Sequence, residues 1–378
     1  MRNKGLLQSG FAIIAILSLL SCKKDMRGFC DCNQDDIVAT VSVFASGFNN
    51  PRGLEFGPEG SLYLAEGGVG GTNSTAGTCT QVIPPVGPYT GSTKGARILK
   101  ISKAGEVTTV AENLPSSQTS PSQGSLVGGV GDVALIGNTL YAVLAGAGCS
   151  HGVAGIPNGI IKVNKDKSWE LIANLSEWQM SHPVAKPEED DFEPDGTWYS
   201  MIDVGGKLYA VEPNHGEIVS VNHKGEINRL IDISASQGHI VPTVITYYKG
   251  NFYVGNLDVF PITGNSKIYK ITPDGEISVV ATGFSAILGI AFDKAGGLNV
   301  LENTTGNPFP TPGTGDIIRI DPSGNRRTLV TGLNLPTGLT YGPDDNLYVS
   351  NWGFGPKALG GGEILKVSIN CEKQWKGK

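Results

Sequence analysis

Short runs in which apolar and polar residues partly alternate recur along the whole chain, separated by turns rich in Gly, Pro, Asn and Asp. A period of two is typical of half-buried β-strands. One run, usually beginning Leu-Tyr, occurs six times, at residues 62–66, 140–144, 208–212, 252–256, 298–302 and 347–351. Long runs of Ala, Glu, Lys and Leu are missing, which excludes a helical bundle.

The runs belong to a repeated unit of four strands. An Ile- and Lys-rich third run follows each Leu-Tyr run, and a fourth run follows at residues 107–114, 169–175, 227–233, 277–284 and 327–333. The sixth copy of the fourth run stands at the front of the chain, at residues 41–48. Strand exchange of this kind closes a ring and leaves few free sheet edges. We therefore predict an all-β fold, a six-bladed β-propeller closed by pairing the N-terminal strand with the last blade.

A propeller of this topology has two faces, and the loops on them differ in length. The turns between first and second strands are short, whereas the other loops vary in length, as at residues 67–95, 115–131, 176–197, 260–265 and 303–315. Function usually resides in such variable loops on a rigid scaffold. We therefore expect the functional site on the long-loop face.

The last residue of the second strand forms one column around the ring, mostly carboxylates and amides: Glu66, Leu144, Glu212, Asn256, Glu302 and Asn351. Hard cations such as Ca²⁺ bind six to eight oxygen ligands of this kind. Two interpretations remain open. The five polar members are candidate metal ligands, or each side chain caps the adjacent turn.

The start of the first strand forms a second, mostly polar column. Its members are Arg52, Asp132, Ser200, Thr243, Leu288 and Thr337. We take the polar five as candidate ligand-binding residues. Arg52 and Asp132 either pair across adjacent blades, or Arg52 binds an anionic ligand.

Four of the five histidines fall on the predicted long-loop face, where their imidazoles suit acid–base or metal chemistry. His215 and His239, with Glu302, are the candidate catalytic residues; the alternative is that these histidines are ordinary loop residues. The acidic run at residues 187–195 is expected to be a solvated loop.

The N-terminus has the features of an export signal. Arg2 and Lys4 precede an apolar stretch at residues 11–20, which ends in Leu19-Leu20-Ser21-Cys22. The stretch is too short to span a bilayer. We expect a lipoprotein signal peptide (1–21), acylation at Cys22, a lipid-anchored linker (22–40), the propeller (41–370) and a C-terminal tail (371–378). Acylation would hold the protein outside the cytoplasm, at the outer membrane of a bacterial envelope.

The remaining cysteines suit an oxidising compartment. Cys79 and Cys149 follow the second strands of the first two blades and can bridge neighbouring loops. Cys371 can pair with Cys30 or Cys32, which precede the predicted closing strand, so a bridge there would lock the ring.

Several classes of function are excluded. The net charge of −6 and the lack of a basic patch argue against nucleic-acid binding. No P-loop, nucleophile elbow or dinucleotide fingerprint is present, so we expect no nucleotide cofactor.

Two repeats resemble known propeller families. Residues 50–66 and 335–351 are similar to NHL and SMP-30-type repeats. The long first loop, the phrase at residues 96–101 and Gly128-Gly129-Val130-Gly131-Asp132 resemble the ScyD/ScyE family of exported proteins. That resemblance implies a β-propeller without implying a reaction. SMP-30-type relatives are calcium-dependent lactonases, and Glu66, Asn256, Glu302 and Asn351 resemble their ligands in type only.

Two functions are therefore predicted. The first is a lipid-anchored protein that binds a small ligand, a glycan or a protein partner on its loop face. The alternative is a metal-dependent hydrolase or lactonase, in which Ca²⁺ held by Glu66, Glu212, Asn256 and Glu302 polarises a carbonyl and activates water.

Overall fold

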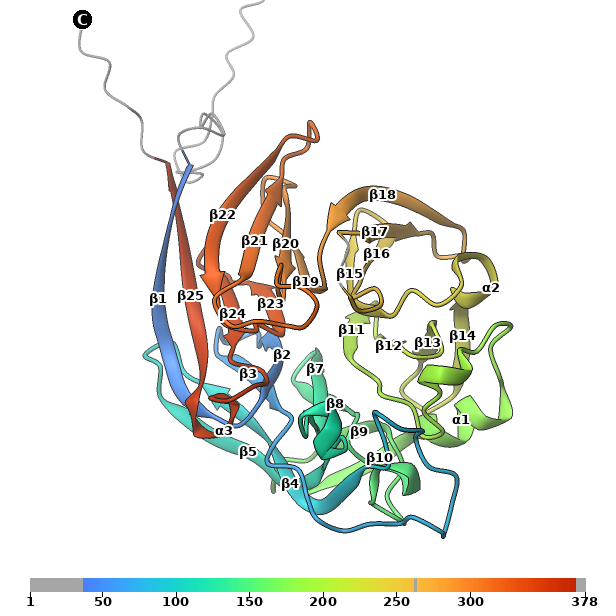
Figure 1. The fold of residues 1–378 in the computed structure, drawn as a ribbon. Helices are drawn as coiled ribbons and strands as arrows, with labels where there is room; N and C mark the ends of the chain where they lie inside the picture. The colour runs from blue at the N-terminus through green and yellow to red at the C-terminus, as the bar shows by residue number, and fades with distance from the viewer. Residues whose placement is uncertain (1–36, 262–263, 372–378) are drawn as a thin grey trace, which may run out of the picture.

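The computed structural model describes residues 37–261 and 264–371, which form six antiparallel sheets around a central axis (Figure 1). Each sheet is one blade, and its first strand lies nearest the axis, in contact with the first strands of its neighbours. The predicted six-bladed β-propeller is confirmed.

The strands follow the predicted runs closely. Blade one consists of β2 (Pro51–Phe56), β3 (Leu62–Glu66), β4 (Thr90–Ile101) and β5 (Val107–Gln118), with β6 (Val127–Gly128) at its edge. Blade two consists of β7 (Val130–Ile136), β8 (Thr139–Leu144), β9 (Gly159–Val163) and β10 (Trp169–Asn174). Blade three consists of β11 (Ser200–Val204), β12 (Lys207–Glu212), β13 (Glu217–Val221) and β14 (Ile227–Asp232).

The other three blades repeat this order. Blade four consists of β15 (Pro242–Tyr248), β16 (Asn251–Asn256), β17 (Ser266–Ile271) and β18 (Ile277–Phe284). Blade five consists of β19 (Ile287–Phe292), β20 (Leu298–Glu302), β21 (Gly315–Ile320) and β22 (Arg326–Leu333). Blade six consists of β23 (Gly338–Tyr341), β24 (Leu347–Asn351), β25 (Gly362–Cys371) and β1 (Ile37–Phe48).

Ring closure occurs in blade six, where β1 pairs antiparallel with β25 and forms the outer edge of the sheet (Figure 1). Pairing begins at Ile37 with Cys371 and ends at Phe48 with Gly362. The strand therefore starts within the segment expected to be linker, and β25 reaches one residue into the expected tail. The early start has a simple cause, because the apolar pattern resumes at buried Ile37 directly after two aspartates.

Buried aliphatic and aromatic side chains fill the spaces between blades. Between blades six and one, Phe48 packs with Leu62, Leu64 and Tyr348 in a single cluster. The closing strand therefore contributes to an interblade core as well as to a sheet edge.

Blade one departs from the prediction. Strand β4 begins at Thr90, inside the expected loop, and its pairing with β5 continues to Gln118 through three register shifts. The loop before β4 is tied to blade two by the predicted disulfide between Cys79 and Cys149. Cys22, Cys30 and Cys32 lie outside the described residues.

Helical elements are short and occur in connections. They are α1 (Leu175–Ser181), α2 (Ser234–Gln237), α3 (Ala358–Gly361), and the 3₁₀ turns η2 (Pro121–Gln123), η3 (Cys149–His151) and η4 (Glu189–Asp191). Among the described residues, no helix has the length and apolar character needed to cross a membrane.

Truncation of the closing strand's buried anchor should weaken the whole ring. The Phe48 side chain is 1% exposed, so Phe48→Ala is expected to lower the free energy of unfolding by about 3–5 kcal/mol. Val43→Ala in the same strand, where the side chain is 57% exposed, should change it by less than about 0.5 kcal/mol. Urea unfolding of both variants tests this, and equal effects would contradict the assignment of Phe48 as an anchor.

Candidate functional site: the central channel

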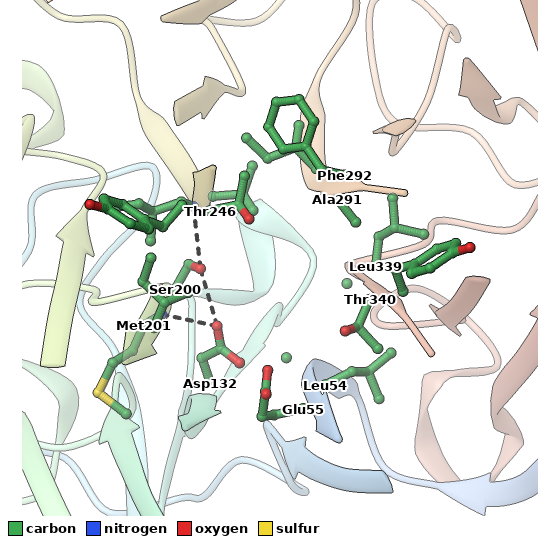
Figure 2. A pocket seen from close by; sticks show the side chains of 18 of the residues that line it. Leu54, Glu55, Asp132, Ser200, Met201, Thr246, Ala291, Phe292, Leu339 and Thr340 are labelled. Atoms are coloured by element: carbon green, nitrogen blue, oxygen red, sulfur yellow. Dashed lines mark hydrogen bonds between the residues drawn. The ribbon is translucent and has the colours of Figure 1, made fainter. Parts of the chain in front are cut away.

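A cavity of about 410 Å³ occupies the central channel. All six first strands contribute to its wall: β2, β7, β11, β15, β19 and β23. Figure 2 shows their side chains arranged around an open centre. A cavity of this size, lined by both apolar and polar groups, is large enough to hold a small molecule.

The cavity faces the short hairpins. Its exposed wall residues, Tyr247 and Lys294, lie at the far ends of the first strands. At the other end, the Tyr199 hydroxyl donates a hydrogen bond (3.1 Å) to the carbonyl of Thr337 in the opposite blade. Arg52 also lies at this end of the strands and is buried. We expected the site on the long-loop face. The cavity instead opens toward the short hairpins, because the side chains of Tyr199 and Arg52 lie across the channel at its long-loop end.

Three of the five predicted ligand-binding residues, Asp132, Ser200 and Thr337, line the cavity. The other two make structural contacts. Thr243 is buried and donates to the carbonyl of Ile287 (2.5 Å). Arg52 forms no ion pair with Asp132 within the described part of the chain.

Arg52 joins three parts of the ring through main-chain contacts. Its guanidinium donates to the carbonyls of Gly353 and Val127, each at 2.6 Å. Burial lowers the pKa of this group, and the nearby Tyr199 opposes that shift. Because two carbonyls already hold the guanidinium, its position favours a structural role over the predicted contact with an anionic ligand.

The Asp132 carboxylate is held by one wall of the cavity. It accepts hydrogen bonds from the backbone N–H of Met201 (2.9 Å) and Val133 (2.8 Å) and from the Ser200 hydroxyl (3.1 Å). Burial nevertheless raises its pKa to about 7, with these bonds opposing the shift. Asp132 is therefore partly protonated near neutral pH.

Glu55 lies beside Asp132 at the cavity wall and was not predicted as a site residue (Figure 2). Its side chain has no hydrogen bond or ion pair among the described residues. Burial first, and then the charges of Asp132 and Asp203, raise its pKa to about 8. The predicted column marks this strand at Arg52 and gives no signal for Glu55, because side chains three positions apart in a strand point to opposite faces.

The predicted column at the ends of the second strands is a set of caps. In four blades the side chain at the end of the second strand accepts a backbone N–H from the segment leading into the first strand of the same blade. The pairs are Asn49 to Glu66 (3.0 Å), Thr197 to Glu212 (3.0 Å), Ser285 to Glu302 (2.5 Å) and Asn334 to Asn351 (2.8 Å). In blade four, Asn256 donates to the carbonyl of Ile240 (2.8 Å). The capping interpretation is confirmed at these positions.

These contacts do not fit the predicted calcium site. Glu66 is also paired with Arg97, with 2.5 Å between Nε and Oε2. Burial raises the pKa of Glu212 and of Glu302 to about 7, which lowers the ligand charge available near neutral pH. Within the described residues, no three His, Cys, Asp or Glu side chains are grouped so that they could hold a metal ion.

The predicted catalytic histidines, His215 and His239, pack against the loop that contains the acidic run at residues 187–195. His215 is buried, with Nε2 2.8 Å from Gln179 Nε2 and 3.2 Å from the carbonyl of Glu193. Burial lowers its pKa. Burial also acts to lower the pKa of His239, but its pairing with Asp191 (3.1 Å) outweighs burial and the net shift is upward. Neither histidine lines the cavity, and Glu302 is a cap in blade five.

The acidic run is only partly solvated, contrary to expectation. Glu193 is 3% exposed and accepts from the Tyr89 hydroxyl (2.7 Å), with His151 3.3 Å away. Asp195 accepts from the Ser150 hydroxyl (2.7 Å). The run therefore locks the long loops of blades one to three together.

No family model matches the chain, and no curated protein does. Solved structures with the same fold are numerous. One is a Bacteroides thetaiotaomicron protein of unknown function, with 15% identity, a TM-score of 0.56, and 88% of this chain and 76% of that chain covered.

Two other similar structures carry functional descriptions. A B. thetaiotaomicron auxiliary nutrient binding protein has 12% identity, a TM-score of 0.54, and 88% and 77% coverage. A gluconolactonase from Xanthomonas campestris has 10% identity, a TM-score of 0.53, and 88% and 89% coverage. At these identities the similarity establishes the fold, which hosts many unrelated functions.

The capping role of Glu302 predicts a specific mutational pattern. Glu302→Gln keeps a carbonyl acceptor for the Ser285 N–H and should change the free energy of unfolding by less than about 0.5 kcal/mol, whereas Glu302→Ala should cost about 1–2 kcal/mol. Chemical denaturation at pH 7 measures both. Equal losses in the two variants would mean that the carboxylate charge itself is required.

Proposed function

We propose that this chain is an envelope β-propeller that binds a small organic ligand in its central channel. The observation that carries this proposal is the 410 Å³ cavity, into which an unpaired carboxyl group projects from otherwise structural strands. Glu55 is half-buried, and its carboxyl group has no hydrogen bond or ion pair among the described residues. A carboxyl group that lines a preformed cavity and is not engaged by the protein is available to a ligand.

The proposed location is the cell envelope. Acylation at Cys22 would tether the propeller to the membrane, and the Cys79–Cys149 disulfide agrees with an oxidising compartment. The same proposal includes membership of the ScyD/ScyE family, which the motifs of this chain resemble. A membrane tether suits a protein that retains a ligand close to the cell surface.

A calcium-dependent lactonase is the weaker candidate. The predicted ligands Glu66, Glu212, Asn256 and Glu302 already bind backbone groups of their own blades. A reaction at that column would require these caps to be released, and no observation favours such a change.

Filling the channel tests the proposed function. Ala291 is 7% exposed and lines the cavity, so Ala291→Phe should occupy the space that a ligand needs. A library of small amines, sugars, carboxylic acids and lactones is screened by thermal unfolding, with and without Ca²⁺. We expect at least one compound to raise the melting temperature of the wild type, because a ligand that binds only the folded state stabilises it.

The same compound should fail to stabilise Ala291→Phe. Leu359→Ala, at an exposed long-loop position, is the matched control and should respond as the wild type does. Stabilisation that survives in Ala291→Phe and is lost in the loop variant would place the binding site on the long-loop face and contradict the proposal.

A further inference from the structure

The acidic wall of the channel has no counter-charge. Glu55 and Asp132 lie next to each other on the cavity lining (Figure 2), and the only other charge that raises the pKa of Glu55 is that of Asp203, which is also acidic. In the described part of the chain, neither carboxyl group forms an ion pair. Placing two carboxylates together away from bulk water is unfavourable unless a cation or a proton is present.

The cations of the protein near the channel are engaged elsewhere. Lys294, at the open end, pairs with Asp345 at 2.5 Å. Arg319 pairs with Asp293 at 2.7 Å. Arg52 donates to two carbonyls at the closed end. With these three cations engaged elsewhere, a proton or a cationic ligand is left to neutralise the Glu55–Asp132 pair.

The rest of the wall suits an organic group. Apolar residues also line the cavity, among them Leu54, Ile290, Ala291 and Leu339, and Figure 2 labels Leu54, Ala291 and Leu339 around its open centre. Phe292 lines the cavity across the opening from the two carboxyl groups, with its ring stacked on that of Tyr248 (centroids 4.0 Å apart). Aliphatic and aromatic surface attracts the carbon skeleton of a ligand, and aromatic faces also attract organic cations.

We propose that the channel binds a protonated organic amine, with its ammonium group between the carboxylates of Glu55 and Asp132 and its carbon skeleton along the apolar wall. This assignment rests on the proposed channel-binding function and narrows it to a ligand class. An ammonium group supplies several donors, and hydrogen bonds between ionised partners are stronger than neutral ones. A bare divalent ion suits the site less, since hard cations need more oxygen ligands than these two side chains provide.

Matched amine–alcohol pairs test the charge requirement. Calorimetric titrations at pH 8 compare 2-phenylethylamine with 2-phenylethanol and cyclohexylmethylamine with cyclohexylmethanol. In each pair the expected result is at least about tenfold tighter binding of the amine to the full-length protein, because only the amine forms charge-assisted bonds.

Variants assign the effect to named groups. Glu55→Gln and Asp132→Asn should each weaken amine binding about tenfold and leave the alcohols within about twofold. Glu106→Gln removes an equal charge from an exposed position outside the cavity wall and is the control, with an expected change of less than about twofold.

The outcomes separate the two proposals. Alcohols that bind as tightly as amines, with both lost in Ala291→Phe, would overturn the amine assignment and keep the channel as the site. Amines that bind wild type and Glu55→Gln equally would also overturn the assignment. Saturable Ca²⁺ binding that requires Glu55, without amine binding, would replace the amine by a metal ion. Binding that Ala291→Phe does not affect would overturn both proposals.

Discussion

The antiparallel pairing of β1 with β25 is the constraint on which the rest of the structure depends. It completes blade six with a strand from the other end of the chain, so the six first strands meet around one channel instead of forming an open arc. The close contacts between the first strands of adjacent blades then fix the width of that channel. A cavity with a definite set of wall residues is possible only because the ring is closed.

Inside each blade, a second interaction repeats. The residue that ends the second strand reaches the segment leading into the first strand and accepts its backbone N–H, with glutamate and asparagine serving the same purpose. Asn256 serves the same segment by donating to a carbonyl. These caps position the start of every first strand they serve, and so they fix the closed end of the channel. The polar column that looks like a metal site in the sequence is thus part of the scaffold.

The sequence predicts the fold well because strand periodicity, turn residues and repeat count all depend on local pattern. The exchange of the first strand into blade six and the Cys79–Cys149 bridge follow from the same repeat register. The site is only partly predictable. Asp132, Ser200 and Thr337 were found as strand starts, but Glu55 acquires its unusual environment from Asp132 and Asp203, which belong to other blades.

The open end of the channel was misjudged for a similar reason. Loop length suggested the long-loop face, whereas one hydrogen bond across the ring, from Tyr199 to Thr337, helps close that end. No linear pattern in the sequence marks a contact between opposite blades. The contacts of the acidic run with His151 and His239 are likewise tertiary contacts that no local pattern marks.

The central claim is that Glu55 projects into the channel without a partner of its own, and its titration tests this most directly. The pKa of Glu55, near 8 in the folded protein, lies above the ordinary value of 4.5, so the folded state keeps a proton that the unfolded state has lost. The contribution of Glu55 to the free energy of unfolding is therefore lost as pH rises from about 4.5 to 8. A glutamine at this position does not titrate, so the variant loses no such contribution.

The measurement is the free energy of unfolding of Glu55→Gln minus that of the wild type, from pH 5 to pH 9, with exposed Glu106→Gln as the control. The account predicts that this difference rises in favour of Glu55→Gln up to about pH 8, by on the order of 1–3 kcal/mol, and then levels off. A difference that stays constant across this range, like that of the control, would mean that Glu55 is solvated or paired, and would contradict the account.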